Sequence, residues 1–123
     1  MARRPPPPPT LSEEALRMVA TRFRVLSDPG RLRILNQLML GEASVGELVE
    51  EVELEQPTVS RHLAILRREG IVSRRSEGNR AIYRIEDSTV TRLCAIACGG
   101  LLEQLSGDLD ALPEAGAWRG SGI

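Results

Sequence analysis

Arginines gather in one stretch of this chain, from Pro57 to Arg84. The stretch holds seven arginines against two glutamates, whereas residues 42–56 hold six glutamates and no basic residue. The formal net charge of the whole chain is only −1, so the basic character is local. A solvated charged surface would not explain why the basic residues collect in one place. A local basic patch is what binding to nucleic-acid phosphates requires, and the stretch therefore favours nucleic-acid binding.

Short polar side chains accompany the first of these arginines. Hydroxyl groups and an arginine near the start of a helix can reach base edges or phosphates in a DNA groove. The side chains that we expect to contact DNA from this helix are Gln56, Thr58, Ser60 and Arg61.

Three further arginines, Arg74, Arg75 and Arg80, bracket the turn signal Glu77-Gly78-Asn79. Each phosphate that such an arginine neutralises releases counterions, so these residues should dominate the salt dependence of DNA binding. Asn79 serves the turn first and can also reach the DNA backbone. We therefore predict that these three arginines and Asn79 form the second part of the DNA interface.

Cys94 and Cys98 are the only cysteines, and they lie four residues apart in a predicted helix. At that spacing the Cβ atoms are about 5–6 Å apart, whereas a disulfide prefers about 3.8 Å. We therefore expect two thiols, which can bind a soft thiophile such as an arsenical or a d10 metal ion. Free cysteine also suits tight helix packing as a small hydrophobe. An effector site and plain packing both remain open, and neither requires a cofactor.

Capping signals divide the chain into helices. Thr10-Leu-Ser-Glu13 and Ser44-Val-Gly-Glu47 match the capping box, and Asp28-Pro29 combines an N-cap with a proline at the first helical position. Apolar residues at helical spacing follow each start, and glycines mark the stops. We expect helices from residue 10 to about Leu26, from Pro29 to the stop at Gly41, from Ser44 through Val52, and from Gln56 to the stop at Gly70.

A hairpin and one more helix follow. We predict short strands over 72–76 and 80–85, joined by the hairpin turn signal Glu77-Gly78-Asn79. Asp87-Ser88 caps a last helix that reaches about Leu105 and carries an apolar stripe with Leu101. The fold class is therefore mainly α with a small β-hairpin. Four helices, a basic hairpin and a fifth helix are typical of a winged helix-turn-helix.

Three segments carry a more specific likeness: Phe23–Leu35, Val59–Leu66 and Glu69–Val72. In order and spacing, the chain from about Leu16 to Leu105 resembles the ArsR/SmtB family of bacterial winged-helix repressors. The resemblance implies a homodimer formed by the first and fifth helices. It also implies that the fourth helix enters the major groove while the hairpin touches the flanking DNA. The chain offers His62 no second histidine or nearby cysteine, so we do not expect it to bind zinc, and its position in the family implies a contact with the DNA backbone.

The sensing sites of that family match only in part. Its Cys-Val-Cys motif on the third helix is absent, because the matching residues are Val45-Gly-Glu-Leu-Val49. Its zinc site on the fifth helix needs histidine, and the only histidine here is His62. Its persulfide-sensing pair needs a cysteine on the second helix, where this chain has none. Cys94 and Cys98 are what remains for an effector.

The chain is expected to form one domain with two tails. We predict a disordered proline-rich arm over 1–10, a winged-helix domain for DNA binding and dimerisation over 11–106, and a flexible tail over 107–123. No apolar run approaches a membrane span and the start lacks a signal-peptide core, which predicts a cytoplasmic protein with no membrane partner. No Gly-rich nucleotide loop, carboxylate pair or Ser/His/Asp set is visible, so an enzyme is not expected.

The predicted function is that of a dimeric transcriptional repressor. The dimer would bind double-stranded DNA at a near-palindromic operator, with its two recognition helices about one helical turn apart. An effector at the fifth helix, a soft metal(loid) or a thiol-reactive signal at Cys94 and Cys98, would release it. The alternative is a winged-helix module that binds protein without selecting a DNA sequence.

Overall fold

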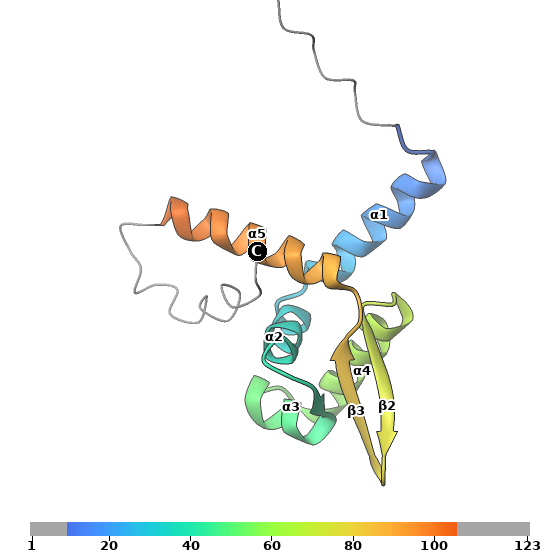
Figure 1. Cartoon of the computed structure of the whole chain (residues 1–123), viewed down its shortest axis with the longest axis vertical. Coiled ribbons are helices and arrows are strands. Elements are labelled where there is room, and N and C mark those ends of the chain that lie inside the picture. The colour runs from blue at the N-terminus through green and yellow to red at the C-terminus, as the bar shows by residue number, and fades with distance from the viewer. Residues whose placement is uncertain (1–9, 106–123) are drawn as a thin grey trace, which may run out of the picture.

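The protein is described by a computed structural model that covers residues 10–105 (Figure 1). The arm expected at 1–10, apart from Thr10, and the tail expected at 107–123 lie outside these residues. The elements are α1 (Glu13–Leu26), α2 (Pro29–Leu38), β1 (Ala43–Ser44), α3 (Val45–Val52), α4 (Gln56–Arg68), β2 (Val72–Glu77), β3 (Arg80–Ile85) and α5 (Ser88–Gln104). The predicted order of helices and hairpin is confirmed, with one short strand in addition.

The first helix begins later than its capping signal suggested. The N-cap is Ser12, whose Oγ accepts a hydrogen bond from the Ala15 N–H at 3.1 Å. Glu13 then lies in the first turn, where a carboxylate interacts favourably with the positive end of the helix dipole. The prediction that Thr10 caps this helix was wrong, because Ser12 offers the same hydroxyl two residues closer to the helix.

The capping box predicted at α3 is confirmed. The Ser44 Oγ accepts a hydrogen bond from the Glu47 N–H at 3.2 Å, and the Glu47 Oε1 accepts one from the Ser44 N–H at 3.1 Å. Each side chain therefore satisfies a backbone donor that the helix itself cannot. The position of the Glu47 carboxylate is fixed as a consequence.

Gly70 ends α4 and redirects the chain into β2. Its φ of 73° lies in the left-handed region that favours glycine. The Gly70 N–H donates to the Arg67 carbonyl at 3.0 Å, and the Ile71 N–H donates to the Leu66 carbonyl at 2.9 Å. This pair of bonds is the Schellman motif, which satisfies the last carbonyls of a helix.

β2 and β3 form an antiparallel hairpin whose register runs from Val72–Ile85 to Glu77–Arg80. The first strand extends one residue past the prediction, so the loop is Gly78-Asn79 alone, with φ of 63° at Gly78. The additional strand, β1, pairs with Tyr83 and Ile82 of β3, and the sheet order is β1-β3-β2. The base of the hairpin is thereby attached to the start of α3.

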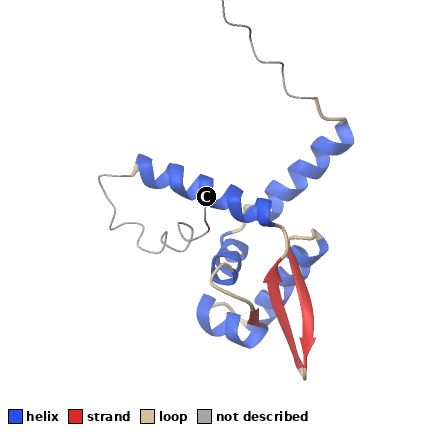
Figure 2. Ribbon diagram, viewed as in Figure 1, coloured by secondary structure: helices blue, strands red, loops and turns tan. Residues whose placement is uncertain are grey.

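The core is aliphatic and is built mainly from α2, α3, α4 and the hairpin, with the end of α1 and the start of α5. Figure 2 shows how these helices and strands are arranged. The core includes the one tyrosine, Tyr83, at its edge. The largest fully buried side chains are Ile34, Leu35, Leu48, Val59, Leu63, Leu66 and Ile71. The tip of the hairpin points away from α1 and α5, which extend from the other end of the core in different directions.

Those two helices carry large apolar side chains on their surfaces. In the single chain the exposed ones are Leu16, Met18, Val19 and Phe23 of α1 and Leu93, Ile96, Leu101 and Leu105 around α5. Val90, at the start of α5, is instead buried in the core. The core therefore holds the first turn of α5, and the rest of the helix presents an apolar surface.

An arginine joins α1 to the ends of two other helices. The Arg22 Nη1 donates to the Asp87 carboxylate, and its Nη2 donates to the Glu69 carbonyl at 3.1 Å. Asp87 is the N-cap of α5 and accepts a hydrogen bond from the Thr89 N–H at 3.0 Å, while Glu69 is the C-cap of α4. The start of α5 is thus tied both to α1 and to the end of α4.

We predict that Asp87→Asn destabilises the fold in a pH-dependent way. Hydrogen bonds from Thr89, together with the charge of Arg22, lower the pKa of Asp87 from its ordinary value of 3.8. This stabilisation is present above about pH 4 and is lost as the pH falls through the lowered pKa. Asparagine keeps the cap and removes the charge. Because both partners are partly exposed, we expect a loss of about 0.5–1 kcal/mol at pH 7 in urea unfolding.

The difference between wild type and Asp87→Asn should shrink as the pH falls from 5 to 3. Glu103→Gln is the control, since Glu103 is an exposed carboxylate of the same helix that forms no ion pair within residues 10–105. An equal loss in both variants would show that the junction adds no stability.

Candidate nucleic-acid interface

One face of α4 is anchored in the core and the opposite face is exposed. Val59, Leu63 and Leu66 are fully buried. Gln56, Ser60 and Arg61 are exposed near the start of the helix, whereas Thr58 is half-buried. Anchoring by the three apolar residues fixes the rotation of the helix about its axis. The N-terminal half of α4 therefore presents polar side chains at a defined position on the surface.

His62 lies on the side of α4 that packs against the start of α2. Its side chain is only 12% exposed, with Nε2 3.7 Å from the Asp28 Oδ1 and Nδ1 3.3 Å from the Arg31 Nη1. A Cβ atom at Gly30 would lie 2.9 Å from the His62 Nε2, so glycine permits this approach. Burial lowers the pKa of His62, which favours the neutral ring. His62 is therefore held by polar contacts with the start of α2. Its contact with the DNA backbone stays a prediction.

The hairpin carries the second group of predicted residues. Arg74, Arg75, Asn79 and Arg80 are all exposed. Because side chains alternate along a strand, Arg74 and Arg75 point to opposite faces of the ribbon. The register places Arg75 and Arg80 on the same face, since Arg75 is opposite Ile82 and Arg80 is opposite Glu77. Figure 1 shows α4 beside the β2–β3 ribbon, so the two predicted groups lie on neighbouring elements.

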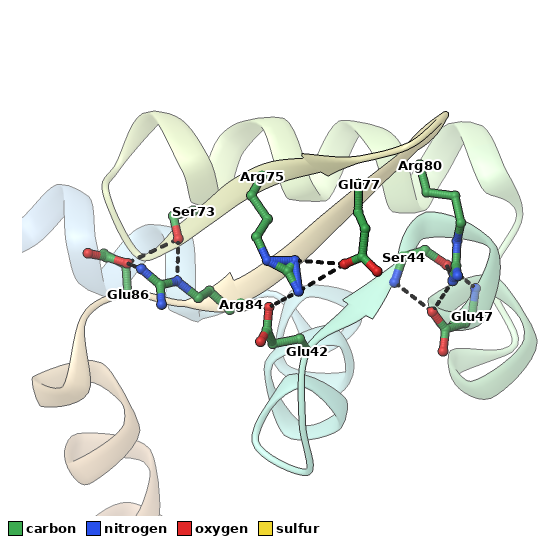
Figure 3. A network of polar contacts seen from close by, with 9 residues as sticks. All are labelled: Glu42, Ser44, Glu47, Ser73, Arg75, Glu77, Arg80, Arg84 and Glu86. Atoms are coloured by element: carbon green, nitrogen blue, oxygen red, sulfur yellow. Dashed lines mark hydrogen bonds and ion pairs between the residues drawn. The ribbon is translucent and has the colours of Figure 1, made fainter.

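Carboxylates occupy the face of the ribbon that carries Arg75 and Arg80 (Figure 3). The Arg80 Nη2 lies 2.5 Å from the Glu47 Oε1 and donates to the Ser44 Oγ at 3.0 Å. The Arg75 Nη2 lies 3.1 Å from a carboxylate oxygen of Glu42 and 3.1 Å from one of Glu77. Sequence patterns do not predict the pairs with Glu42 and Glu47, because these glutamates are distant from the hairpin in the chain and no local pattern places them beside it.

Arg84 takes part in a third group on the same ribbon face. Its Nη2 lies 3.2 Å from the Glu86 Oε2, and its Nε donates to the Ser73 Oγ at 3.1 Å. Arg74 forms no ion pair with any carboxylate of residues 10–105. The two faces of the ribbon therefore differ: one bears paired arginines and the other an unpaired one.

Cys94 and Cys98 lie together on one wall of an apolar pocket of about 460 Å³. The pocket is formed by the end of α1, the start of α2 and α5, and its lining includes Phe23, Leu26 and Leu32. Both cysteines are free thiols of intermediate exposure. Burial, and secondarily the nearby Cys98, raises the pKa of the Cys94 thiol. At neutral pH the Cys94 side chain is therefore a protonated thiol.

No cluster of three or more His, Cys, Asp or Glu side chains within residues 10–105 is arranged to hold a metal ion. In that same part of the chain, no helix has the length and apolar character needed to cross a bilayer. Within the described residues, α5 of one chain therefore offers two sulfur atoms, those of Cys94 and Cys98, to a thiophilic metal or metalloid.

Proteins of known family resemble this chain in sequence and in fold. The family model described as "Bacterial regulatory protein, arsR family" matches residues 28–74, which run from the N-cap of α2 into β2. The HTH-type transcriptional regulator Rv0081 of Mycobacterium tuberculosis is 40% identical over 96 residues, or 77% of this chain and 84% of that protein. Its crystal structure aligns with a TM-score of 0.70 and 38% identity, covering 80% of this chain and 99% of that one.

Two further similar proteins carry names that state an oligomeric state or a regulated operon. A homodimeric winged helix-turn-helix domain of Mycobacterium bovis, solved by NMR, aligns with a TM-score of 0.65 and 30% identity, covering 83% of this chain and 92% of that one. A probable mercury resistance operon repressor of Streptomyces lividans is 40% identical over 75 residues, or 61% of this chain and 60% of that protein. With the α4 face, the basic ribbon and these similarities in place, the chain belongs to the ArsR family of winged helix-turn-helix proteins and is a DNA-binding transcriptional regulator.

Proposed function

We propose that this regulator is a repressor that binds a near-palindromic operator as a homodimer. The observation that carries the proposal is the exposed polar face of α4, held in a fixed rotation beside a ribbon of arginines. In winged helix-turn-helix proteins such a helix lies in the major groove, with its N-terminal residues against base edges. In each subunit, α4 reads the bases and the β2–β3 ribbon binds the flanking DNA backbone.

The exposure of each residue suggests its role at this interface. Gln56, Ser60 and Arg61 are free to reach base edges, and an arginine can bind guanine in a bidentate manner. Thr58 and His62 lie closer to the core and do not extend into the groove. In this proposal they contact backbone phosphates that lie against the protein surface. The ribbon residues that bind backbone phosphates in this proposal are Arg74, Arg75, Asn79 and Arg80.

Arg61→Ala should weaken binding to the preferred duplex by about 1–3 kcal/mol and reduce its preference over a mixed-sequence duplex. The reason is the loss of a side chain that reads base edges from the start of α4. Fluorescence anisotropy with a duplex selected from a randomised library measures both quantities. Arg68→Ala is the matched control, because Arg68 is exposed on the last turn of the same helix and carries the same charge. Unchanged selectivity in Arg61→Ala would remove this face from the groove.

The apolar surfaces of α1 and α5 support the proposed dimer. Phe23, Leu101 and Ile96 are 54%, 46% and 61% exposed in the single chain. Large apolar side chains clustered on a surface mark an interface, and two-fold dimers are the commonest closed assembly. We propose that α1 and α5 of one subunit pack against the same helices of the partner. The two α4 helices would then face successive major grooves on one side of the DNA.

Leu101→Glu should convert the dimer to monomers at micromolar concentration and abolish tight binding to the palindromic duplex. The reason is that the substitution buries a charge in an apolar interface. Sedimentation velocity measures the oligomeric state, and anisotropy measures DNA binding. Gln104→Glu adds the same charge to an exposed polar position of α5 and should remain dimeric. A Leu101→Glu protein that stays dimeric would exclude this surface from the interface.

We further propose that the pocket beside Cys94 and Cys98 receives a thiophilic effector. A monosubstituted trivalent arsenical, RAs(OH)₂, would react with the two thiols to form RAs(SCys)₂ and release two water molecules. Its organic group would occupy the apolar part of the pocket, between α5 and the ends of α1 and α2. Movement of α5 could reach α4 through the Arg22 junction, because Arg22 binds both the α5 cap and the α4 cap.

Phenylarsonous acid should weaken DNA binding of the wild type by about 5–150-fold, the range of typical allosteric couplings. The Cys94→Ser/Cys98→Ser variant should bind DNA as the wild type does and should not respond. Each single variant should lose most of the response, since two sulfurs are needed to hold the arsenical. Titrating the arsenical against the protein–DNA complex by anisotropy provides the measurement. A full response in the double variant would leave the cysteines as packing residues and place the sensor elsewhere.

A further inference from the structure

Two arginines of the ribbon are held by glutamates that come from outside the ribbon. Glu42 precedes β1, and Glu47 is the third residue of α3. Glu42 pairs with Arg75, and Glu47 pairs with Arg80 (Figure 3). Both arginines belong to the proposed phosphate-binding set. The carboxylates therefore occupy the guanidinium groups that DNA would use.

We propose that Glu42 and Glu47 are internal competitors of the DNA phosphates and set the affinity of this regulator for DNA of any sequence. The proposal rests on the proposed function, in which the ribbon binds the DNA backbone. A guanidinium group binds carboxylates and phosphates through the same fork of N–H donors. DNA binding therefore exchanges one anionic partner for another. The DNA-binding free energy gained from Arg75 and Arg80 is therefore only the difference between their interaction with phosphates and their interaction with the glutamates.

The capping box holds the Glu47 carboxylate in place independently of Arg80. Its Oε1 accepts a hydrogen bond from the Ser44 N–H in the capping box, and Ser44 is buried and paired with β3. The carboxylate thus stays in place with or without the arginine. Hydrogen bonds from Ser44 and, after them, the charge of Arg80 lower the pKa of Glu47, so the carboxylate stays ionised at neutral pH. Pairing therefore restricts the side chain of Arg80 alone.

Exposure of the pairs sets the size of the expected effect. The Arg80 and Glu47 side chains are 58% and 56% exposed, and those of Arg75 and Glu42 are 50% and 45% exposed. Exposed ion pairs are weak and exchange readily. They can therefore reduce DNA affinity severalfold without preventing DNA binding.

Arg74 supplies an internal reference. It lies on the opposite face of β2 and has no carboxylate partner within residues 10–105. In the proposal Arg74 binds phosphate without competition. A glutamate that acts through Arg80 should leave the contribution of Arg74 unchanged.

The test compares Glu47→Gln and Glu42→Gln in the full chain with Glu51→Gln. Glutamine retains the capping-box hydrogen bond at position 47 and removes the charge. Glu51 is exposed on the same helix and forms no ion pair within the described residues, so its variant corrects for the general loss of negative charge. Binding is measured by anisotropy in about 0.1 M salt, with a selected duplex and a mixed-sequence duplex, and thermal unfolding confirms that each variant folds.

Glu47→Gln should bind both duplexes about two- to fivefold more tightly, a change that corresponds to an exposed ion pair. Glu42→Gln should also bind both duplexes more tightly, but by a smaller factor, because Glu77 still pairs with Arg75. The ratio of the two affinities should not change, because every DNA sequence carries phosphates. Glu51→Gln should show a smaller effect. The gain from Glu47→Gln should disappear in an Arg80→Ala background and persist in an Arg74→Ala background.

Weaker binding by Glu47→Gln would overturn the proposal, because it would mean that the pair supports the DNA-binding form. The same gain in all three glutamine variants, or a gain that survives Arg80→Ala, would also overturn it.

Salt titrations of Arg74→Ala, Arg75→Ala and Arg80→Ala separate this failure from failure of the proposed function. Slopes reduced by about one per lost phosphate contact would keep the ribbon in the interface. Unchanged slopes in all three would remove both the ribbon contact and the competition.

Discussion

Burial of one face of α4 is the constraint on which the rest of this protein depends. Val59, Leu63 and Leu66 have no exposed surface, and they fix the helix against α2, α3 and the hairpin base. Among residues 10–105, Tyr83 is the one aromatic residue of an otherwise aliphatic core, so close packing of branched side chains must define that rotation. Once it is defined, Arg61 and Ser60 can only face outward. A rotation error of one residue would place a charged side chain in the core and an apolar one against DNA.

The C-terminal end of α4 connects this core to the hairpin, α1 and α5. At its C-terminal end, Gly70 turns the chain directly into β2, so the ribbon begins where the helix stops. The carbonyl of Glu69 at the same end accepts a hydrogen bond from Arg22 of α1, which also binds the cap of α5. The helix proposed to read DNA and the helices proposed to form the dimer thus share one polar junction. A displacement of the start of α5 would therefore move a residue that also contacts the end of α4.

Electrostatics divides the surface in a way that the total charge conceals. The chain has nearly equal numbers of acidic and basic residues, yet the glutamates of 42–56 and the arginines of 57–84 form separate blocks along the sequence. Pairing of β1 with β3 brings the two blocks into contact at Glu47 and Arg80. In our proposal the arginines of the ribbon attract phosphates, and the carboxylate beside Arg80 reduces that attraction. A protein that must leave its DNA site on a signal gains from an affinity that is not maximal.

Local patterns were sufficient for the helices, the hairpin and the fold class. The capping box at Ser44, the stop at Gly70 and the turn at Gly78-Asn79 each depend on a few adjacent residues, and periods of 3.6 and 2 residues distinguish helix from strand. The same patterns identified the i, i+4 cysteines and the exposed Gln56, Ser60 and Arg61 of α4, but they did not show that Thr58 is half-buried. They were insufficient where two nearby residues offered equivalent chemistry, as at Thr10 and Ser12.

Tertiary structure alone decided the features that depend on distant partners. The two residues of β1 are too few to carry a periodic signal, and they form a strand only because β3 lies beside them. The burial of His62 depends on Gly30 of α2, which leaves room for the ring. The pairing of Arg75 and Arg80 with Glu42 and Glu47 depends on the register of the hairpin against the start of α3. Sequence patterns record which side chains a segment has, whereas ion pairs and burial also depend on which segments meet.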